Sequence, residues 1–234
     1  MPRFDAQMVL DAVSAGQPVE GQDLSGLDLS GFDLGTANLR GSDLRNANLT
    51  ETILQEAHLE RVTLDGAIFR DTDLTGANIS EITFKDIDLS SCKLSGITAL
   101  NATLIRVVLS SQDLKEITLS GSTFVYSTLK DIDLSGSDLH NMKILFCLID
   151  SCRFDKANIK ETDFGLSRIK ESSFNNADLS NSSFIASHLH NVKATKSILI
   201  GADFTLLNAD NLDLTDSNYQ GIITEKTAIK SLKK

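Results

Sequence analysis

The chain repeats every five residues without a break in register. A large apolar residue stands at every fifth position from Leu24 to Tyr219, which makes forty consecutive centres. All are Leu, Ile or Phe except four, namely Ala99, Ala194, Ala209 and Tyr219. Self-similarity at a fixed period is the signature of a solenoid, in which each repeat packs only on its neighbours. The period therefore predicts a rod with a continuous apolar core.

The residue types within each repeat predict an extended step followed by a corner. Two residues before each centre stands a small residue, such as Ala37 or Ala47, and a polar residue such as Asn38 or Asn48 lies between. Alternate side chains of an extended chain point to the same face, so the small residue and the centre point inward. The last two positions are rich in Ser, Thr, Gly, Asn and Asp, which favour turns.

The segments ANLRG, SDLRN, ANLTE and ADLSN fit the pattern A(D/N)LXX, and the chain resembles the pentapeptide-repeat proteins over residues 22–221. The resemblance implies an all-β fold, a right-handed quadrilateral parallel β-helix with four pentapeptides per coil. Forty pentapeptides would then make about ten coils. Residues twenty apart should stack in columns along the rod.

Both ends of such a rod need protection, because they expose core and unpaired strand edges. Residues 4–15 have the apolar spacing of a short amphipathic helix, ended by Gly16 and Pro18. We expect an N-terminal capping helix and lead-in over 1–21, the β-helix over 22–221, and a C-terminal cap or tail over 222–234, whose apolar residues could fold back on the last coil.

Composition argues against several functions. The net charge of −10 disfavours direct nucleic-acid binding, which needs a basic surface. We find no apolar run long enough to span a membrane and no signal peptide, so we expect a cytoplasmic protein. The family resemblance further suggests a bacterial one. The three cysteines all stand at the small inward position and are expected to be reduced core residues, although Cys147 and Cys152 lie close enough in sequence to approach each other.

The sequence contains little that suggests catalysis. We find no glycine-rich phosphate loop, and Ser and Asp are abundant because the repeat uses them. His188, His190 and Asp210 should lie close together and make a metal site conceivable, but no closed ligand set is evident. We therefore predict no enzyme activity, no cofactor and no metal.

One surface departs from the repeat. After the fourth coil, outward and corner positions on two adjacent faces change from polar to apolar. Such a contiguous patch usually marks an interaction site, and aromatic residues are typical of interfaces. It could instead be covered by a terminal segment or only stiffen the rod. We call these residues the apolar strip: Ile105, Val108, Val125, Tyr126, Leu145, Phe146, Leu148, Leu166, Ile185 and Leu206.

A second surface is acidic. Gyrase-inhibiting members of the resembled family are thought to imitate duplex DNA, which suggests an alternative role as a DNA-mimic regulator of a type II topoisomerase. Lys93, Arg153 and Lys193 interrupt the same column, however, so gyrase is a disfavoured partner. The residues of this acidic column are Asp33, Asp73, Asp113, Asp133 and Asp213.

The favoured interpretation is a non-enzymatic scaffold for protein–protein interaction. Its working surface would be the apolar strip, which would bind a protein partner or a second copy of the chain. The sequence does not separate these two uses.

Overall fold

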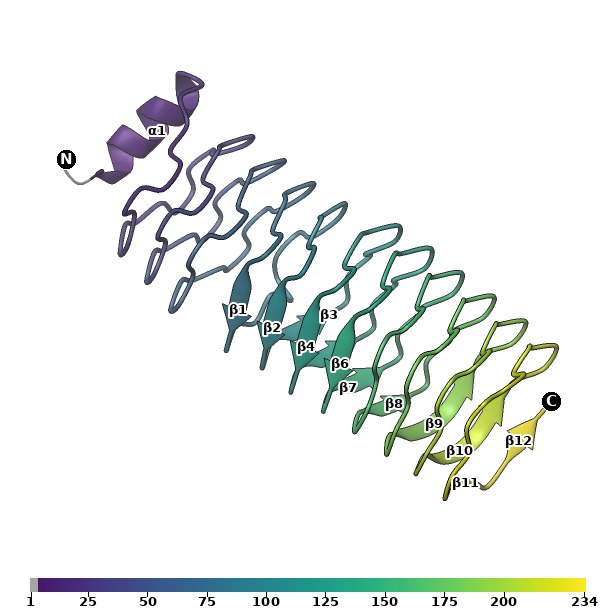
Figure 1. The fold of residues 1–234 in the computed structure, drawn as a ribbon. Coiled ribbons are helices and arrows are strands. Elements are labelled where there is room, and N and C mark those ends of the chain that lie inside the picture. The colour runs from purple at the N-terminus through teal and green to yellow at the C-terminus, as the bar shows by residue number, and fades with distance from the viewer. Residues whose placement is uncertain (1–3) are drawn as a thin grey trace.

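The backbone climbs one level every twenty residues and forms a straight rod with a helix at one end (Figure 1). The computed structural model describes residues 4–234. Parallel pairing joins Asp23 to Asp43, Asp43 to Thr63, and so on to the pairing of Asp203 with Ile223. The β-solenoid expected from the five-residue repeat, with one short helix, is confirmed.

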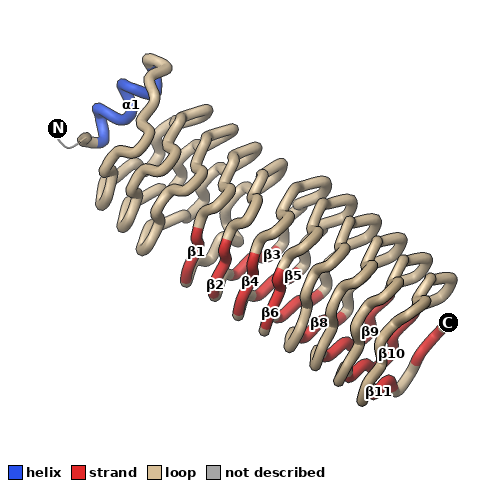
Figure 2. The backbone as a smooth tube through the Cα atoms, in the orientation of Figure 1, coloured by secondary structure: helices blue, strands red, loops and turns tan. Residues whose placement is uncertain are grey.

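Regular strands gather on two faces, while the rest of the rod pairs through single-residue bridges (Figure 2). One sheet has the order β1-β2-β4-β6 and the other β11-β10-β9-β8-β7-β5-β3, with β12 also on β10. The elements are α1 (Ala6–Ser14), β1 (Thr83–Lys85), β2 (Thr103–Ile105), β3 (Val108–Ser110), β4 (Thr123–Val125), β5 (Thr128–Lys130), β6 (Lys143–Leu145), β7 (Leu148–Asp150), β8 (Arg168–Lys170), β9 (His188–Lys193), β10 (Asn208–Asp213), β11 (Ala228–Ile229) and β12 (Leu232–Lys233).

The number of turns that carry regular strands is slightly lower than the ten coils expected. Strands occupy residues 83–233, which is about eight turns of twenty residues. Toward the N-terminus the same register continues only as isolated bridges.

The polar residue between the two inward positions stabilises the corner that follows it. The Asp28 carboxylate accepts hydrogen bonds from the backbone N–H of Ser30 at 3.2 Å and from its hydroxyl at 2.6 Å. The Asn48 side-chain oxygen accepts in the same way from the Thr50 N–H. Short Asp and Asn side chains reach the backbone two residues ahead, which explains why the repeat prefers them there.

The core is continuous along the rod. Every centre from Leu24 to Leu214 is buried. Many of the small inward positions are polar, because their side chains reach a carbonyl of the preceding turn. The Ser42 hydroxyl donates to the Val19 carbonyl at 2.7 Å, and the Thr52 hydroxyl donates to the Leu29 carbonyl at 2.9 Å. A buried hydroxyl that is hydrogen-bonded in this way costs little stability.

The two ends differ. Helix α1 begins after Asp5, whose carboxylate accepts from the Met8 N–H at 2.8 Å, and its Val9 side chain is fully buried against the first turn. In the C-terminal segment, expected as a cap or tail, β11 and β12 pair with β10 in register and extend the rod. Because the extended segment keeps the twenty-residue spacing, it satisfies its backbone by pairing.

Candidate interaction surface

The apolar strip lies at the corner where the two strand-bearing faces meet, and residues twenty apart in it are neighbours. Ile105, Val125 and Leu145 pair across β2, β4 and β6. Their side chains are half-buried, whereas the larger corner residues project outward. Tyr126 is 57% exposed, and Leu166 is 53% exposed. The structure thus brings the ten strip residues together on one corner of the rod, as the twenty-residue spacing predicts.

Four large apolar residues of the strip occupy a backbone conformation that disfavours them. Tyr126, Phe146, Leu166 and Leu206 have φ between 54° and 59°. In this left-handed region a Cβ atom crowds the backbone, at a cost of about 1–2 kcal/mol per residue, and only Gly, Asn and Asp enter it readily. Every corner of the rod needs this conformation, so the turns of the strip keep bulky residues against a local preference.

The same corner holds small or polar residues in the N-terminal turns. In the N-terminal turns this column of the rod holds Gly26, Asn46 and Gly66, all with positive φ. The change from Gly and Asn to Tyr, Phe and Leu along one column is therefore not required by the turn. Glu56 and Lys156 have the same conformation at other corners, so the large apolar side chains, rather than the conformation, set this column apart.

The two aromatic side chains of the strip form a small rigid platform. The rings of Tyr126 and Phe146 stack with centroids 4.9 Å apart and an interplanar angle of 27°. Stacking of this kind is worth about 0.5–1.5 kcal/mol beyond the area it buries. It also fixes the orientation of both rings, so a partner would meet a preformed surface.

Neither end of the described chain covers the strip. Helix α1 packs on the N-terminal turns, and β11 and β12 continue the rod at its other end (Figure 1). This excludes the alternative that a segment within residues 4–234 folds over the strip. Its exposed corner side chains are available to other molecules.

Other exposed apolar residues among 4–234 are more scattered along the rod, although Ile198 and Ile200 lie close together. Ile198 is exposed, but its paired neighbours are Asp178 and Asn218. Ile53 is exposed between Asp33 and Asp73. Single apolar residues among polar neighbours are normal on a protein surface. Sequence reasoning left these positions out, and the structure gives them no common role.

The acidic column is aligned as expected, but most of its charge is compensated. Lys93 Nζ lies 3.0 Å from Asp73, and Lys233 Nζ lies 3.2 Å from Asp213. Lys115 lies 3.0 Å from Asp113 and 3.4 Å from Asp133. A surface that imitates DNA needs unneutralised negative charge along its length. The local ion pairs therefore weaken the DNA-mimic alternative.

Asp73 is the buried member of the acidic column and predicts a pH dependence of stability. Its carboxylate accepts hydrogen bonds from the Thr75 N–H, the Gln55 amide and the Lys93 ammonium. Burial opposes ionisation, but these hydrogen bonds outweigh it and hold the pKa of Asp73 well below its usual range. Because the pKa is lowered in the folded state, this stabilisation is present above about pH 4 and is lost as the pH falls further.

We therefore expect Asp73→Asn to lower the free energy of unfolding at pH 7 by about 1–3 kcal/mol. Urea titrations at a series of pH values should show this difference shrinking below about pH 4. Asp33→Asn is the matched control, because exposed Asp33 in the same column makes its hydrogen bond to the Gly35 N–H at the surface. An equal and pH-independent cost for both variants would contradict the assignment.

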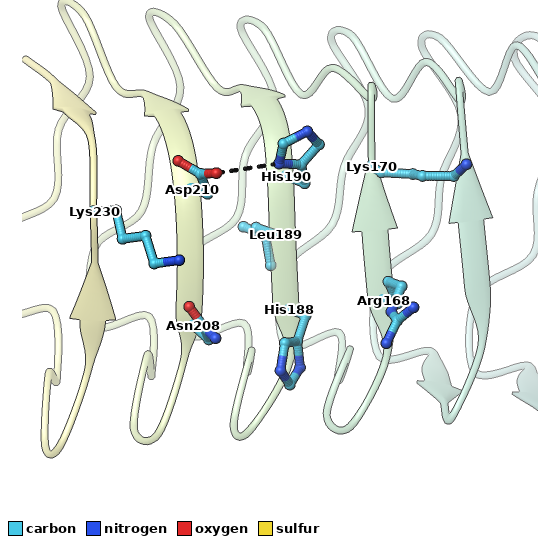
Figure 3. A pocket seen from close by; sticks show the side chains of 8 residues that line it. All are labelled: Arg168, Lys170, His188, Leu189, His190, Asn208, Asp210 and Lys230. Atoms are coloured by element: carbon cyan, nitrogen blue, oxygen red, sulfur yellow. Dashed lines mark ion pairs between the residues drawn. The ribbon is translucent and has the colours of Figure 1, made fainter.

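The three residues considered for a metal site lie around a shallow depression of about 340 Å³ on β8–β11 (Figure 3). His190 Nδ1 is 3.6 Å from Asp210 Oδ2. His188 is the first residue of β9, and its side chain lies away from this pair (Figure 3). Within residues 4–234 no three His, Cys, Asp or Glu side chains are arranged to hold a metal ion. We call this site the basic depression; its lining is Arg168, Lys170, His188, Leu189, His190, Asn208, Asp210 and Lys230.

The cysteines are free and buried in the core. Burial raises the pKa of Cys92, Cys147 and Cys152 to about 11. The thiolate is the reactive nucleophile, and at pH 8 only about one thousandth of each thiol is then ionised. These thiols are built for packing rather than for nucleophilic chemistry.

A thiol-labelling experiment tests this. At pH 8 we expect Ellman's reagent to leave the native protein unreacted for hours and to titrate three thiols in denaturant. Fast reaction of one thiol in the native state would show that its turn opens locally.

Comparison with known proteins agrees with the architecture. The family described as Pentapeptide repeats matches in eight copies over residues 23–55, 42–81, 52–96, 102–141 and 172–206. No curated protein matches the sequence. In addition, none of the helices within residues 4–234 has the length and apolar character needed to cross a bilayer.

Several solved structures are also similar to the chain, at low sequence identity. HetL, a pentapeptide-repeat protein involved in heterocyst differentiation regulation from the cyanobacterium Nostoc sp. strain PCC 7120, is 19% identical, with 94% of this chain and 95% of HetL covered and a TM-score of 0.41. Full-length QnrB1, a plasmid-mediated fluoroquinolone resistance protein, is 15% identical, with 66% and 94% covered and a TM-score of 0.27. Rfr23 from the cyanobacterium Cyanothece 51142 is 17% identical, with 68% and 91% covered and a TM-score of 0.20.

Proposed function

The chain belongs to the pentapeptide-repeat family, and from that premise we propose that it is a non-enzymatic scaffold that binds a protein partner through the apolar strip. The observation that carries the proposal is the set of bulky residues at positive φ, led by Tyr126 and Phe146. Corners elsewhere hold Gly, Asn or charged residues such as Lys156 in the same conformation, whereas the large apolar ones all lie in this column. The free thiols support a reducing compartment, and we propose a cytoplasmic location.

The rod supplies a surface that is ordered before binding. Backbone hydrogen bonds join each turn to the next, for example from the Tyr126 N–H to the Leu145 carbonyl at 3.1 Å. A partner that docks on such a surface does not have to order it, so more of the interaction free energy appears as affinity. Burial of the strip would contribute about 25 cal/mol for each Å² of apolar surface removed from water.

The mode of binding follows from the backbone. The strands beneath the strip already pair on both sides, because β4 lies between β2 and β6. A partner cannot add a strand in this region, as peptides do at an open sheet edge. Binding must therefore use side-chain contacts with the strip.

Site-specific photo-crosslinking in the source cell tests the proposal. A benzophenone side chain in place of Leu166 should crosslink one protein partner or a second copy of the chain. The same group in place of Lys156, also an exposed corner residue with positive φ, serves as the control. Equal crosslinking at both positions, or none at Leu166, would contradict the strip as the binding surface.

A further inference from the structure

The basic depression has a charge that is opposite to that of the whole chain. Its lining includes Arg168, Lys170 and Lys230, two histidines, and a single carboxylate, Asp210. The protein as a whole carries a net charge of −10. An excess of positive charge in one hollow of an acidic protein marks that hollow as a place where an anionic group is favoured.

Part of this positive charge has no carboxylate to balance it. The Lys170 ammonium is balanced, because its Nζ lies 2.8 Å from Asp150. The single carboxylate of the lining, Asp210, lies 3.6 Å from the His190 ring. Among residues 4–234, Arg168 and Lys230 make no ion pair within 4.0 Å, and both are exposed. Figure 3 shows that they approach the hollow from β8 and from the segment that follows β11.

The hollow is continuous with the apolar strip. Leu148 of the strip pairs directly with Arg168 across β7 and β8. Leu166, which is 53% exposed, precedes Arg168 by two residues at the adjoining corner. One partner could therefore cover both surfaces at the same time, with apolar side chains on the strip and an anionic group in the hollow.

We propose that the partner of the strip is a protein segment that carries Asp or Glu side chains next to apolar ones, with its carboxylates bound by Arg168 and Lys230. This inference rests on the proposed function of the strip and names the chemistry of its partner. The guanidinium of Arg168 matches a carboxylate through two parallel hydrogen bonds, which gives geometric selectivity.

The segment binds through its side chains rather than as an added strand. The Arg168 N–H already donates to the Cys147 carbonyl, and the His188 N–H donates to the Ser167 carbonyl, both at 2.9 Å. The backbone beneath the hollow is thus satisfied by neighbouring turns. Contact with the side chains of Arg168 and Lys230 has to supply the recognition.

Fluorescence anisotropy with labelled ten-residue peptides tests the chemistry. The probe alternates Glu with Leu and Phe. Three comparison peptides replace Glu by Lys, by Ser, or by phosphoserine. We expect the acidic apolar probe to bind full-length protein and the Lys and Ser peptides to bind at least about tenfold more weakly. Raising the salt concentration from 50 to 300 mM should weaken the acidic probe several-fold, because the hollow is exposed.

Variants separate the hollow from the strip. Arg168→Glu with Lys230→Glu should weaken the acidic probe about tenfold or more. Lys156→Glu with Lys196→Glu, which makes the same change of net charge at another exposed corner of the rod, should leave binding unchanged. Circular dichroism confirms that each variant is folded.

Four outcomes overturn the inference. The first is that no acidic peptide binds at 1 mM. The second is that both charge variants weaken binding equally. The third is that the phosphoserine peptide alone binds, which would make the hollow a phosphate site. The fourth is that the strip crosslinks only to a second copy of the chain. Suppose that Leu166 crosslinks to another protein but the Arg168→Glu/Lys230→Glu variant binds normally. The strip would then remain the proposed binding surface, and only the acidic chemistry of its partner would be rejected.

Discussion

Phe164→Ala is expected to lower the free energy of unfolding by about 3–5 kcal/mol, as for other buried Phe residues. The Phe164 side chain is fully buried, and its ring lies 5.0 Å from Phe184, in a stacked arrangement, and 5.8 Å from Phe174. Opposite faces of the rod meet in this cluster, so the shortened side chain leaves a cavity that neither face can fill without moving. Urea unfolding measures the loss.

The effect of Phe164→Ala should be confined to part of the rod. Each turn contacts only its neighbours, so stability is nearly a sum along the axis. Amide hydrogen exchange should show lost protection in the turns on either side of Phe164 and unchanged protection around Leu44. Phe32→Ala is the control, because Phe32 is only partly buried and should cost much less. A cost below about 1 kcal/mol, or protection lost evenly along the rod, would contradict this account of the core.

Tyr126→Asn together with Phe146→Asn should weaken partner binding strongly while leaving the fold intact. Aromatic residues at the centre of an interface commonly contribute 2 kcal/mol or more each, so the pair should weaken binding by about a hundredfold or more. Asn accepts the left-handed conformation that both positions require, with φ of 54° and 55°. The thermal midpoint should therefore stay the same or rise.

Weaker binding without a loss of stability would separate a role in the interface from a role in the fold. Binding can be followed with the crosslinked partner or with the acidic apolar peptide, and stability by thermal unfolding. Lys156→Asn with Lys196→Asn changes the same kind of corner elsewhere and should affect neither. If the Tyr126 and Phe146 variant unfolds more easily, the two rings serve the rod itself. If it still binds, the strip is not the interface.

The sequence alone was enough to predict the architecture, because every repeat has the same inward positions and the same corner. The apolar centres from Leu24 to Leu214 are buried, and columns such as Ile105, Val125 and Leu145 stack at the predicted interval. Period two places the small residue and the centre inward, and Asp or Asn between them stabilises the corner. The members of the apolar strip could be read from the same arithmetic.

Conformation at the corners and charge compensation required the tertiary structure. The sequence placed Tyr126 and Phe146 at a turn, but only the structure shows that both have positive φ and that their rings stack. It likewise aligned the acidic column without showing that Lys93 neutralises Asp73. The ion pairs of long flexible side chains depend on the three-dimensional positions of residues in neighbouring turns. A repeat pattern does not specify these positions.

The C-terminal segment and the basic depression are two further features that required the tertiary structure. Residues after Tyr219 lose the clear repeat, so the sequence suggested a cap or tail, whereas backbone pairing with β10 extends the rod. Arg168 and Lys230 are sixty-two residues apart in the chain and reach one hollow only because the turns stack. The five-residue period determined the path of the backbone by itself. Which charges remain unpaired on its surface depends on contacts between turns, and these exist only in the folded rod.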